Sequence, residues 1–153
     1  MPRIERDAEI VWEGNLARGV GHLTAASSGA FADLEITSAT RIGAPEGRTS
    51  PEELLAAAHG GCLAMSLSGE LTRVGHPPVR MNLHCTVVMD EVSGQGHQIV
   101  GSQVSLRARV PELDQATFDT AVRAADEGCP FSALLRRAGA SVTLDASLVD
   151  ALD

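Results

Sequence analysis

Hydrophobic and polar residues alternate in several short stretches of the chain, which is the pattern of strands with one buried face. The stretches that predict strands are residues 9–13, about 18–26, 30–38, 79–90, about 100–110 and 142–148. The segment Ser93-Gly94-Gln95-Gly96 separates the fourth stretch from the fifth, and its turn composition predicts an antiparallel hairpin. Residues 43–50 have the composition of a loop.

A capping motif marks the start of the longest predicted helix. Ser50 lies in the N-cap position, Pro51 in the first helical position and Glu53 in the third, where they form a capping box. We expect this helix to extend to about residue 74. Residues 54–67 are apolar on almost every side, which is typical of a helix buried inside a fold.

Two shorter helices are expected near the C-terminus. One follows Asp114 and ends at Gly128, and the next begins at Pro130 and ends at about Gly139. The element order βββ-α-ββ-αα-β predicts an α+β fold in which antiparallel sheets wrap the long central helix. A length of 153 residues fits one domain over residues 1–153.

Composition and charge exclude several classes of function. The chain is 44% hydrophobic and 21% charged, as expected of a folded globular domain. A net charge of −8 without a basic run argues against nucleic acid and anionic membrane surfaces as partners. No apolar stretch is long enough for a membrane span, and the first fourteen residues lack the apolar centre of a secretory signal. We therefore expect a cytoplasmic protein.

Three cysteines carry the candidate chemistry, and each also has a structural interpretation. A reducing cytoplasm makes a structural disulfide improbable. Cys85 lies on the apolar face of a predicted strand, and Cys62 lies within the apolar helix, so packing explains either one taken alone. Cys129 precedes Pro130 and occupies a predicted helix N-cap, where unpaired amides and the helix dipole favour a thiolate.

A metal site is the main competing interpretation. His59 and Cys62 are three residues apart on one helix face and form a feasible pair of zinc ligands. The chain has no CxxC motif and no second helical pair of ligands, so we predict no metal and no cofactor. A cysteine protease would need a histidine base, and nothing in the sequence marks one.

Five segments match the pattern of a known family, and two of them carry Cys62 and Cys129. The segments are VWEGNLARGVG, ATRIG, TSPEELLAAAHGGC, EGCPFSALL and VTLDASL. Together they cover nearly the whole chain, which resembles the OsmC branch of the OsmC/Ohr family of organic hydroperoxide resistance proteins. The resemblance implies an OsmC-like fold, with two α+β chains intertwined as a homodimer around their long helices. It also implies a cofactor-independent peroxidase that reduces organic hydroperoxides.

The same resemblance implies roles for individual residues. Cys62 matches the peroxidatic cysteine, Cys129 the resolving cysteine, and Glu52 the carboxylate ten residues before the reactive cysteine. The catalytic arginine is Arg41 by the pattern of the OsmC branch and Arg18 by that of the Ohr branch, and both stay open. A Cys62–Cys129 disulfide would be reduced by an external dithiol of the lipoyl or thioredoxin type.

The proposed site needs charged groups that one chain alone does not bring to Cys62. A free cysteine is only about 3% thiolate at pH 7, and burial lowers this fraction further, so Cys62 needs a nearby cation. A guanidinium suits this role, and Glu52 would be its partner. Ten residues of helix separate Glu52 from Cys62 by about 15 Å. They share one site only if Glu52 comes from a second chain, and Gly60 and Gly61 would then allow the two helices to cross closely.

A non-catalytic protein is the alternative. In that case an OsmC-like homodimer binds an apolar ligand and its cysteines only fill the core. Leu63, Met65 and Phe131 are candidates for the lining of an apolar pocket in either case.

Overall fold

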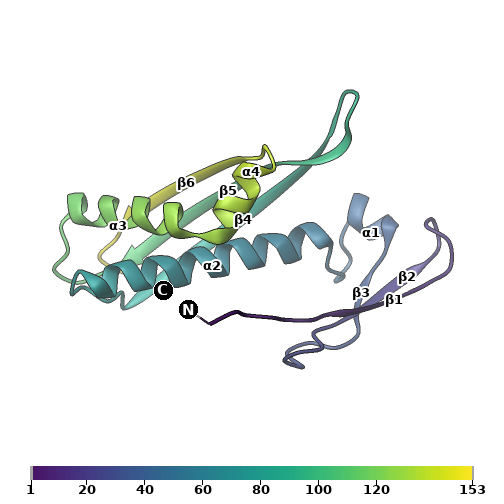
Figure 1. The fold of residues 1–153 in the computed structure, drawn as a ribbon, viewed down its shortest axis with the longest axis horizontal. Coiled ribbons are helices and arrows are strands. Elements are labelled where there is room, and N and C mark those ends of the chain that lie inside the picture. The colour runs from purple at the N-terminus through teal and green to yellow at the C-terminus, as the bar shows by residue number, and fades with distance from the viewer. Residues whose placement is uncertain (1, 153) are drawn as a thin grey trace. The chain divides into compact units, whose positions relative to one another are not determined.

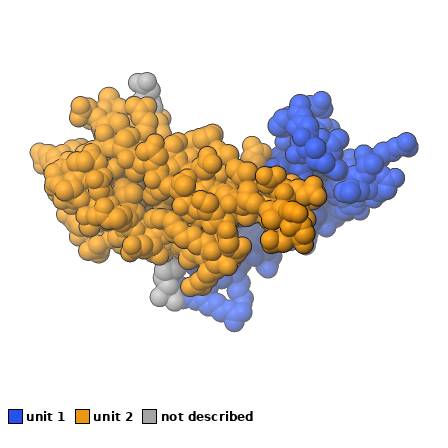
Figure 2. Space-filling view, turned by 90° about the horizontal axis from the view of Figure 1, so that it is seen from above, with its two compact units in different colours: residues 1–51 blue, residues 52–153 orange. Residues whose placement is uncertain are grey.

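The computed structural model describes residues 2–152 of the chain. The chain divides into two compact units, one up to Pro51 and one from Glu52 onward (Figure 2). The single domain predicted over residues 1–153 stays a prediction.

The first unit is a small antiparallel sheet followed by a short helix (Figure 1). Its strands are β1 (Glu9–Glu13), β2 (Val20–Thr24) and β3 (Leu34–Ile36), paired in the order β1-β2-β3. Gly21 lies at the centre of this sheet, and a Cβ atom there would lie 2.8 Å from both the Trp12 ring and the Ile36 side chain. Only glycine leaves room for that packing.

The third strand is shorter than expected, because a helix that the sequence pattern did not reveal follows it. Helix α1 (Ser38–Ile42) begins after Thr37, whose hydroxyl accepts a hydrogen bond from the Thr40 amide. It ends at Gly43, whose amide donates to the Ala39 carbonyl. A helix of five residues is too short to show a hydrophobic period, so only its cap marks it.

The second unit contains the long helix and a second sheet. Its elements are α2 (Pro51–Arg73), β4 (Arg80–Val92), β5 (Gly96–Arg109), α3 (Gln115–Gly128), α4 (Pro130–Arg137) and β6 (Ser141–Leu148). The predicted hairpin is confirmed: β4 and β5 pair antiparallel, with Cys85 opposite Val104. The predicted start of α2 at Pro51 and the two C-terminal helices are confirmed as well.

One part of the fold expectation is wrong, because the second sheet is not antiparallel throughout. Strand β6 pairs with β5 in parallel, from Gly101 opposite Ser141 to Ala108 opposite Leu148. Helices α3 and α4 form the crossover that returns the chain to the same end of the sheet, which is what a parallel neighbour requires. The alternation within β6 predicts a strand but carries no information on its direction.

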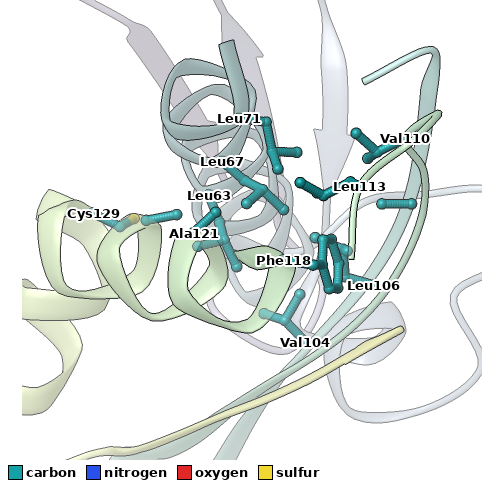
Figure 3. Close-up of a cluster of buried hydrophobic side chains, with 12 residues drawn as sticks. Leu63, Leu67, Leu71, Val104, Leu106, Val110, Leu113, Phe118, Ala121 and Cys129 are labelled. Atoms are coloured by element: carbon teal, nitrogen blue, oxygen red, sulfur yellow. The ribbon is translucent and has the colours of Figure 1, made fainter. Parts of the chain in front are cut away.

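The core of the second unit lies between α2, α3 and one face of the sheet. Figure 3 shows this cluster, with three leucines of α2 facing Val104 and Leu106 of β5 and Phe118 and Ala121 of α3. Along β5, residues 104, 106 and 108 are buried while their neighbours are exposed, so the sheet is covered on one face. The buried α2 residues are His59, Gly60, Leu63, Leu67 and Leu71.

The elements of the second unit do not surround the long helix on all sides, so the burial predicted for residues 54–67 is met only in part within this unit. Met65 is 73% exposed, and Ala57 and Gly61 are exposed too. The apolar residues at these positions do not face the core described above. Packing in that core therefore does not explain why residues 54–67 are apolar on almost every side of the helix.

Candidate functional site

Cys62 and Cys129 approach each other where α2 meets the junction of α3 and α4. Cys62 is half-buried near the middle of α2, and Cys129 is fully buried between the two C-terminal helices. Both are free thiols, and the Cys129 side chain is close enough to the Cys62 sulfur to raise its pKa. The structure therefore brings together the two predicted cysteines, although 67 positions separate them in the chain (129 − 62).

The junction around Cys129 is well defined. Its amide donates to the Asp126 carbonyl at 3.2 Å, and its own carbonyl accepts from the Ala133 amide at 3.0 Å. An ion pair between Arg136 Nη2 and Asp126 Oδ2, at 2.6 Å, ties α4 to the last turn of α3. Pro130 occupies the first position of α4, where its missing amide proton costs nothing. The predicted N-cap position of Cys129 is confirmed, but its side chain makes no capping hydrogen bond.

The surroundings of Cys62 within one chain favour the neutral thiol. Burial raises the pKa of the Cys62 thiol above its usual value, and the neighbouring Cys129 raises it further. The amide of Phe131 and the hydroxyl of Ser66 act in the opposite direction, because both stabilise a thiolate by hydrogen bonding. The balance is a raised pKa, so activation of Cys62 requires a positive charge beyond these groups.

His59 is the centre of a buried polar network that sequence analysis did not assign. Its Nδ1 atom lies 2.7 Å from Ser102 Oγ of β5, and its Nε2 atom lies 2.9 Å from Ser132 Oγ of α4. All three side chains are fully buried. Burial lowers the pKa of His59, Asp126 raises it and Arg136 lowers it, with a net lowering that favours the neutral imidazole.

Cys85 contacts the same network rather than the other two cysteines. Its sulfur lies 3.5 Å from Ser102 Oγ and 3.9 Å from His59 Nδ1. Its Cβ is also the atom that a side chain at Gly60 would meet, at 3.3 Å. Gly60 is thus a point of close approach to β4 of the same chain, and the crossing of two helices at Gly60 and Gly61 stays a prediction. Gly61 has nothing within 4 Å of a Cβ position.

The charged residues of the predicted site lie elsewhere in the chain. Glu52 lies in the first turn of α2, and that helix continues without a break past Cys62, so about 15 Å of helix separates the two. Arg41 lies in α1 of the first unit, beside a small cavity of about 90 Å³ that Trp12, Leu16 and Ile36 also line. Arg18 lies in the turn between β1 and β2 and is exposed.

Comparison with known proteins shows the family to which this fold belongs. The family model for the OsmC-like protein matches residues 43–145. Peroxiredoxin OsmC of Escherichia coli is 34% identical over 145 residues, which cover 95% of this chain and 97% of that protein. The chain belongs to the OsmC-like family.

Solved structures of other OsmC-like proteins share the fold. An organic hydroperoxide resistance protein OsmC from Legionella pneumophila superposes with a TM-score of 0.73 at 22% identity, covering 96% of this chain and 99% of that one. The organic hydroperoxide resistance protein OhrB of Bacillus subtilis gives 0.67 at 25% identity, covering 92% and 98%. An OsmC-like protein of unknown function from Vibrio cholerae gives 0.76 at only 10% identity, covering 95% and 100%. The OsmC-like fold predicted from the sequence is therefore confirmed.

A groove of about 450 Å³ runs between α2 and β4 of this OsmC-like chain. Glu53 and several small residues of α2 line one side, and Leu83, His84 and Cys85 of β4 line the other. None of the three residues expected to line an apolar pocket is among them: Leu63 is part of the core, Met65 is exposed and Phe131 is half-buried.

The pairing of His59 with Cys62 as zinc ligands gains no support. Within residues 2–152 no group of three or more histidine, cysteine, aspartate or glutamate side chains is placed to hold a metal ion. The two ring nitrogens of His59 already have serine partners. No helix within residues 2–152 has both the length and the apolar character needed to cross a membrane.

Proposed function

We propose that this OsmC-like protein is a cysteine-based peroxidase that reduces organic hydroperoxides. The observation that carries the proposal is the approach of the Cys129 thiol to Cys62, in a chain whose E. coli relative is named a peroxiredoxin. A half-buried thiol beside a fully buried one suits a pair in which the first meets substrate and the second meets only the first. The OsmC and OhrB relatives named for organic hydroperoxide resistance support the class of substrate.

The proposed reaction has two protein steps. The Cys62 thiolate attacks the terminal oxygen of the hydroperoxide, the O–O bond breaks, and the alkoxide leaves as an alcohol after taking a proton. Cys62 is then a sulfenic acid. Cys129, as a thiolate, attacks that sulfur, the S–O bond breaks, and hydroxide leaves as water with the Cys129 proton. An external dithiol of the lipoyl or thioredoxin type reduces the Cys62–Cys129 disulfide and restores both thiols.

Activation of Cys62 is assigned to Arg41 and Glu52. The raised pKa of Cys62 in one chain creates the need for a cation, and the guanidinium of Arg41 meets it. Glu52 orients that guanidinium by charge pairing. Arg18 is the alternative source of the cation.

A homodimer completes the proposed site. Glu52 and Cys62 of one helix are too far apart to act together, so Glu52 would serve the Cys62 of the partner chain. Two further observations support a second copy. The apolar side chain of Met65 is exposed on α2, and no hydrophobic residue among residues 2–51 reaches full burial within one chain.

The test is a peroxidase assay with paired cysteine variants. Wild-type protein should consume cumene hydroperoxide faster than hydrogen peroxide, with dihydrolipoamide or thioredoxin as electron donor. Cys62→Ser should leave no turnover above background, because no other thiol replaces the attacking sulfur. Cys129→Ser should reduce about one peroxide per chain and then stop, because the sulfenic acid cannot be resolved. Mass spectrometry after one equivalent of peroxide should find a Cys62–Cys129 link in the wild type.

Cys85→Ser is the matched control, since it removes a thiol of similar burial that the mechanism does not use. It should keep wild-type turnover. A Cys62–Cys85 link, or full activity in Cys62→Ser, would contradict the proposed mechanism. Stable folding with no peroxide consumption by the wild type would favour the non-catalytic, ligand-binding alternative.

A further inference from the structure

The buried network around His59 joins three elements that meet beside the two cysteines. His59 lies on α2, three residues before Cys62. Its ring contacts Ser102 on β5 through Nδ1 and Ser132 on α4 through Nε2. Each nitrogen has one hydroxyl partner, so the neutral ring donates to one serine and accepts from the other. A fully buried imidazole satisfied in this way holds a defined orientation.

The serine on α4 belongs to the turn that faces Cys62. Helix α4 begins at Pro130 immediately after Cys129, and Ser132 is its third residue. The Phe131 amide, one position before Ser132, lies close enough to the Cys62 sulfur to stabilise its thiolate and lower its pKa. The same turn thus presents the Cys129 thiol and the Phe131 amide to Cys62, and the Ser132 hydroxyl attaches this turn to His59 on the same helix as Cys62.

Apart from the contacts with Cys62 itself, the other polar contacts of α4 within the described residues anchor it to α3 or within its own turns. The Asp126–Arg136 ion pair joins α4 to α3, and the Cys129 backbone is bonded to Asp126 and Ala133 on α3 and α4. The hydrogen bond between His59 and Ser132 runs from α2 to α4, so it constrains the separation that a Cys62–Cys129 bond must span.

We propose that His59 is a positioning residue for closure of the Cys62–Cys129 disulfide, acting through Ser132 on the first turn of α4. The Nε2 contact with Ser132 holds the Cys129 turn, and the Nδ1 contact with Ser102 keeps the ring aimed at it. This inference rests on the proposed disulfide chemistry, and it deepens that proposal by naming what sets the geometry of the second step.

Two substitutions separate the contacts of His59. The side-chain amide of glutamine reaches about as far as Nε2, and that of asparagine about as far as Nδ1. His59→Gln therefore keeps the contact with Ser132 and loses that with Ser102, while His59→Asn does the reverse. A merely structural role predicts similar effects of both, because each loses one buried hydrogen bond.

The experiment measures the equilibrium between dithiol and disulfide in glutathione buffers, where no peroxide is needed. One molecule of oxidised glutathione is reduced to two thiols for each Cys62–Cys129 pair that is oxidised. Acid quenching, alkylation and mass spectrometry then quantify the dithiol and disulfide forms of the protein. His59→Asn should lower the equilibrium constant for disulfide formation by about tenfold or more, since that constant scales with the effective concentration of the two thiols, which falls when the Cys129 turn is no longer held. Tenfold corresponds to a reduction potential about 30 mV higher. His59→Gln should stay within about threefold of the wild type.

Alanine substitutions of the two serines test the same contacts, because each removes only the hydroxyl group that meets His59. Ser132→Ala should reproduce the effect of His59→Asn, and Ser102→Ala should have a smaller effect. Adding Ser132→Ala to His59→Asn should change nothing further, because both remove one interaction. His84→Asn is the matched control, since His84 is an exposed histidine on β4 and should leave the constant unchanged.

The outcomes separate this inference from the proposed function. Equal constants for the wild type and Ser132→Ala overturn the inference, as do equal losses in His59→Asn and His59→Gln. A wild type that forms the disulfide but consumes no peroxide overturns the proposed function alone. A wild type that forms no Cys62–Cys129 disulfide in glutathione buffers overturns both the inference and the proposed second step.

Discussion

Polar side chains deep in this protein occur as a connected group rather than singly. His59, Ser102 and Ser132 satisfy one another in the interior, and the Cys85 sulfur lies against the first two. Burying an imidazole without hydrogen-bond partners would destabilise the fold. The two serine hydroxyls therefore allow His59 to lie in the interior. The sequence HGGC suggests a ligand pair, whereas the folded chain shows His59 turned toward hydroxyl groups.

Stability should depend on pH through His59. Burial lowers its pKa in the folded state below the usual value of 6.5, so below about pH 6.5 the unfolded chain binds more protons than the folded one. The free energy of unfolding is then fully retained above that pH and falls as the pH is lowered through it. The slope approaches about 1.4 kcal/mol per pH unit for one proton. Urea unfolding between about pH 5 and pH 7.5, at fixed protein concentration, measures it.

His59→Gln provides the comparison, because it removes the titrating ring and leaves the four other histidines in place. Its unfolding free energy should fall less steeply between the same pH values. A slope equal to that of the wild type would assign the pH dependence to other groups.

The α3–α4 junction shows how secondary structure places a reactive side chain. Two helices meet at Cys129, which ends one and begins the other. Neither helix could continue through it, because Pro130 has no amide proton to donate to α3. Cys129 is thereby fixed in extended backbone at φ −77° and ψ 114°, with its side chain in the core.

The glycines of α2 differ in what they permit, and alanine substitutions distinguish them. Gly69 has nothing within 4 Å of a Cβ position, so Gly69→Ala should stabilise the fold by about 1 kcal/mol through helix propensity alone. A methyl group at Gly60 meets the Cys85 Cβ of β4 at 3.3 Å. Gly60→Ala should therefore stabilise clearly less than Gly69→Ala, or destabilise, as measured by chemical denaturation. Equal gains at both positions would mean that β4 moves away without cost.

The exposed apolar residues of the chain bear on its state of assembly. They occur in both units and include Ile10, Val11 and Leu16 in the first and Met65 and Leu134 in the second. Scattered apolar side chains are normal on a protein surface, but Met65 lies on a helix whose apolar character extends around its circumference. The proposed homodimer, with a second copy packed on α2, would account for that character, which the core of the second unit does not.

Met65→Glu should therefore weaken self-association. In one chain the side chain is already 73% exposed, so a carboxylate there costs little folding free energy. In a homodimer that covers α2, an unpaired charge would be buried, which costs several kcal/mol. Sedimentation should give the wild type a mass twice the 16.0 kDa of the chain, and Met65→Glu should shift it toward the single chain.

Ser105→Glu is the control, because it places the same carboxylate on the exposed face of β5 and should leave the mass unchanged. A wild type that sediments as a single chain at micromolar concentration would exclude the homodimer and, with it, the contribution of Glu52 from a partner.

Local patterns in the sequence were enough to predict most helices and strands of this protein. Capping residues predict the start of α2, a Gly-rich turn predicts the β4–β5 hairpin, and Pro130 predicts the break between α3 and α4. Each of these is an interaction within a few residues, and it persists whatever the rest of the chain does. Helix α1 was missed because a single turn has no period to detect.

Long-range arrangement was decided only in the folded chain. The direction of β6 depends on the path of the crossover, and the role of His59 depends on two serines 43 and 73 positions away. The pKa of Cys62 also depends on Cys129, which the sequence of the helix that contains Cys62 does not reveal. Hydrophobic periodicity reports that a face is covered, but it does not report what covers it. For α2, the hydrophobic pattern alone therefore does not distinguish a core within one chain from the proposed interface between two chains.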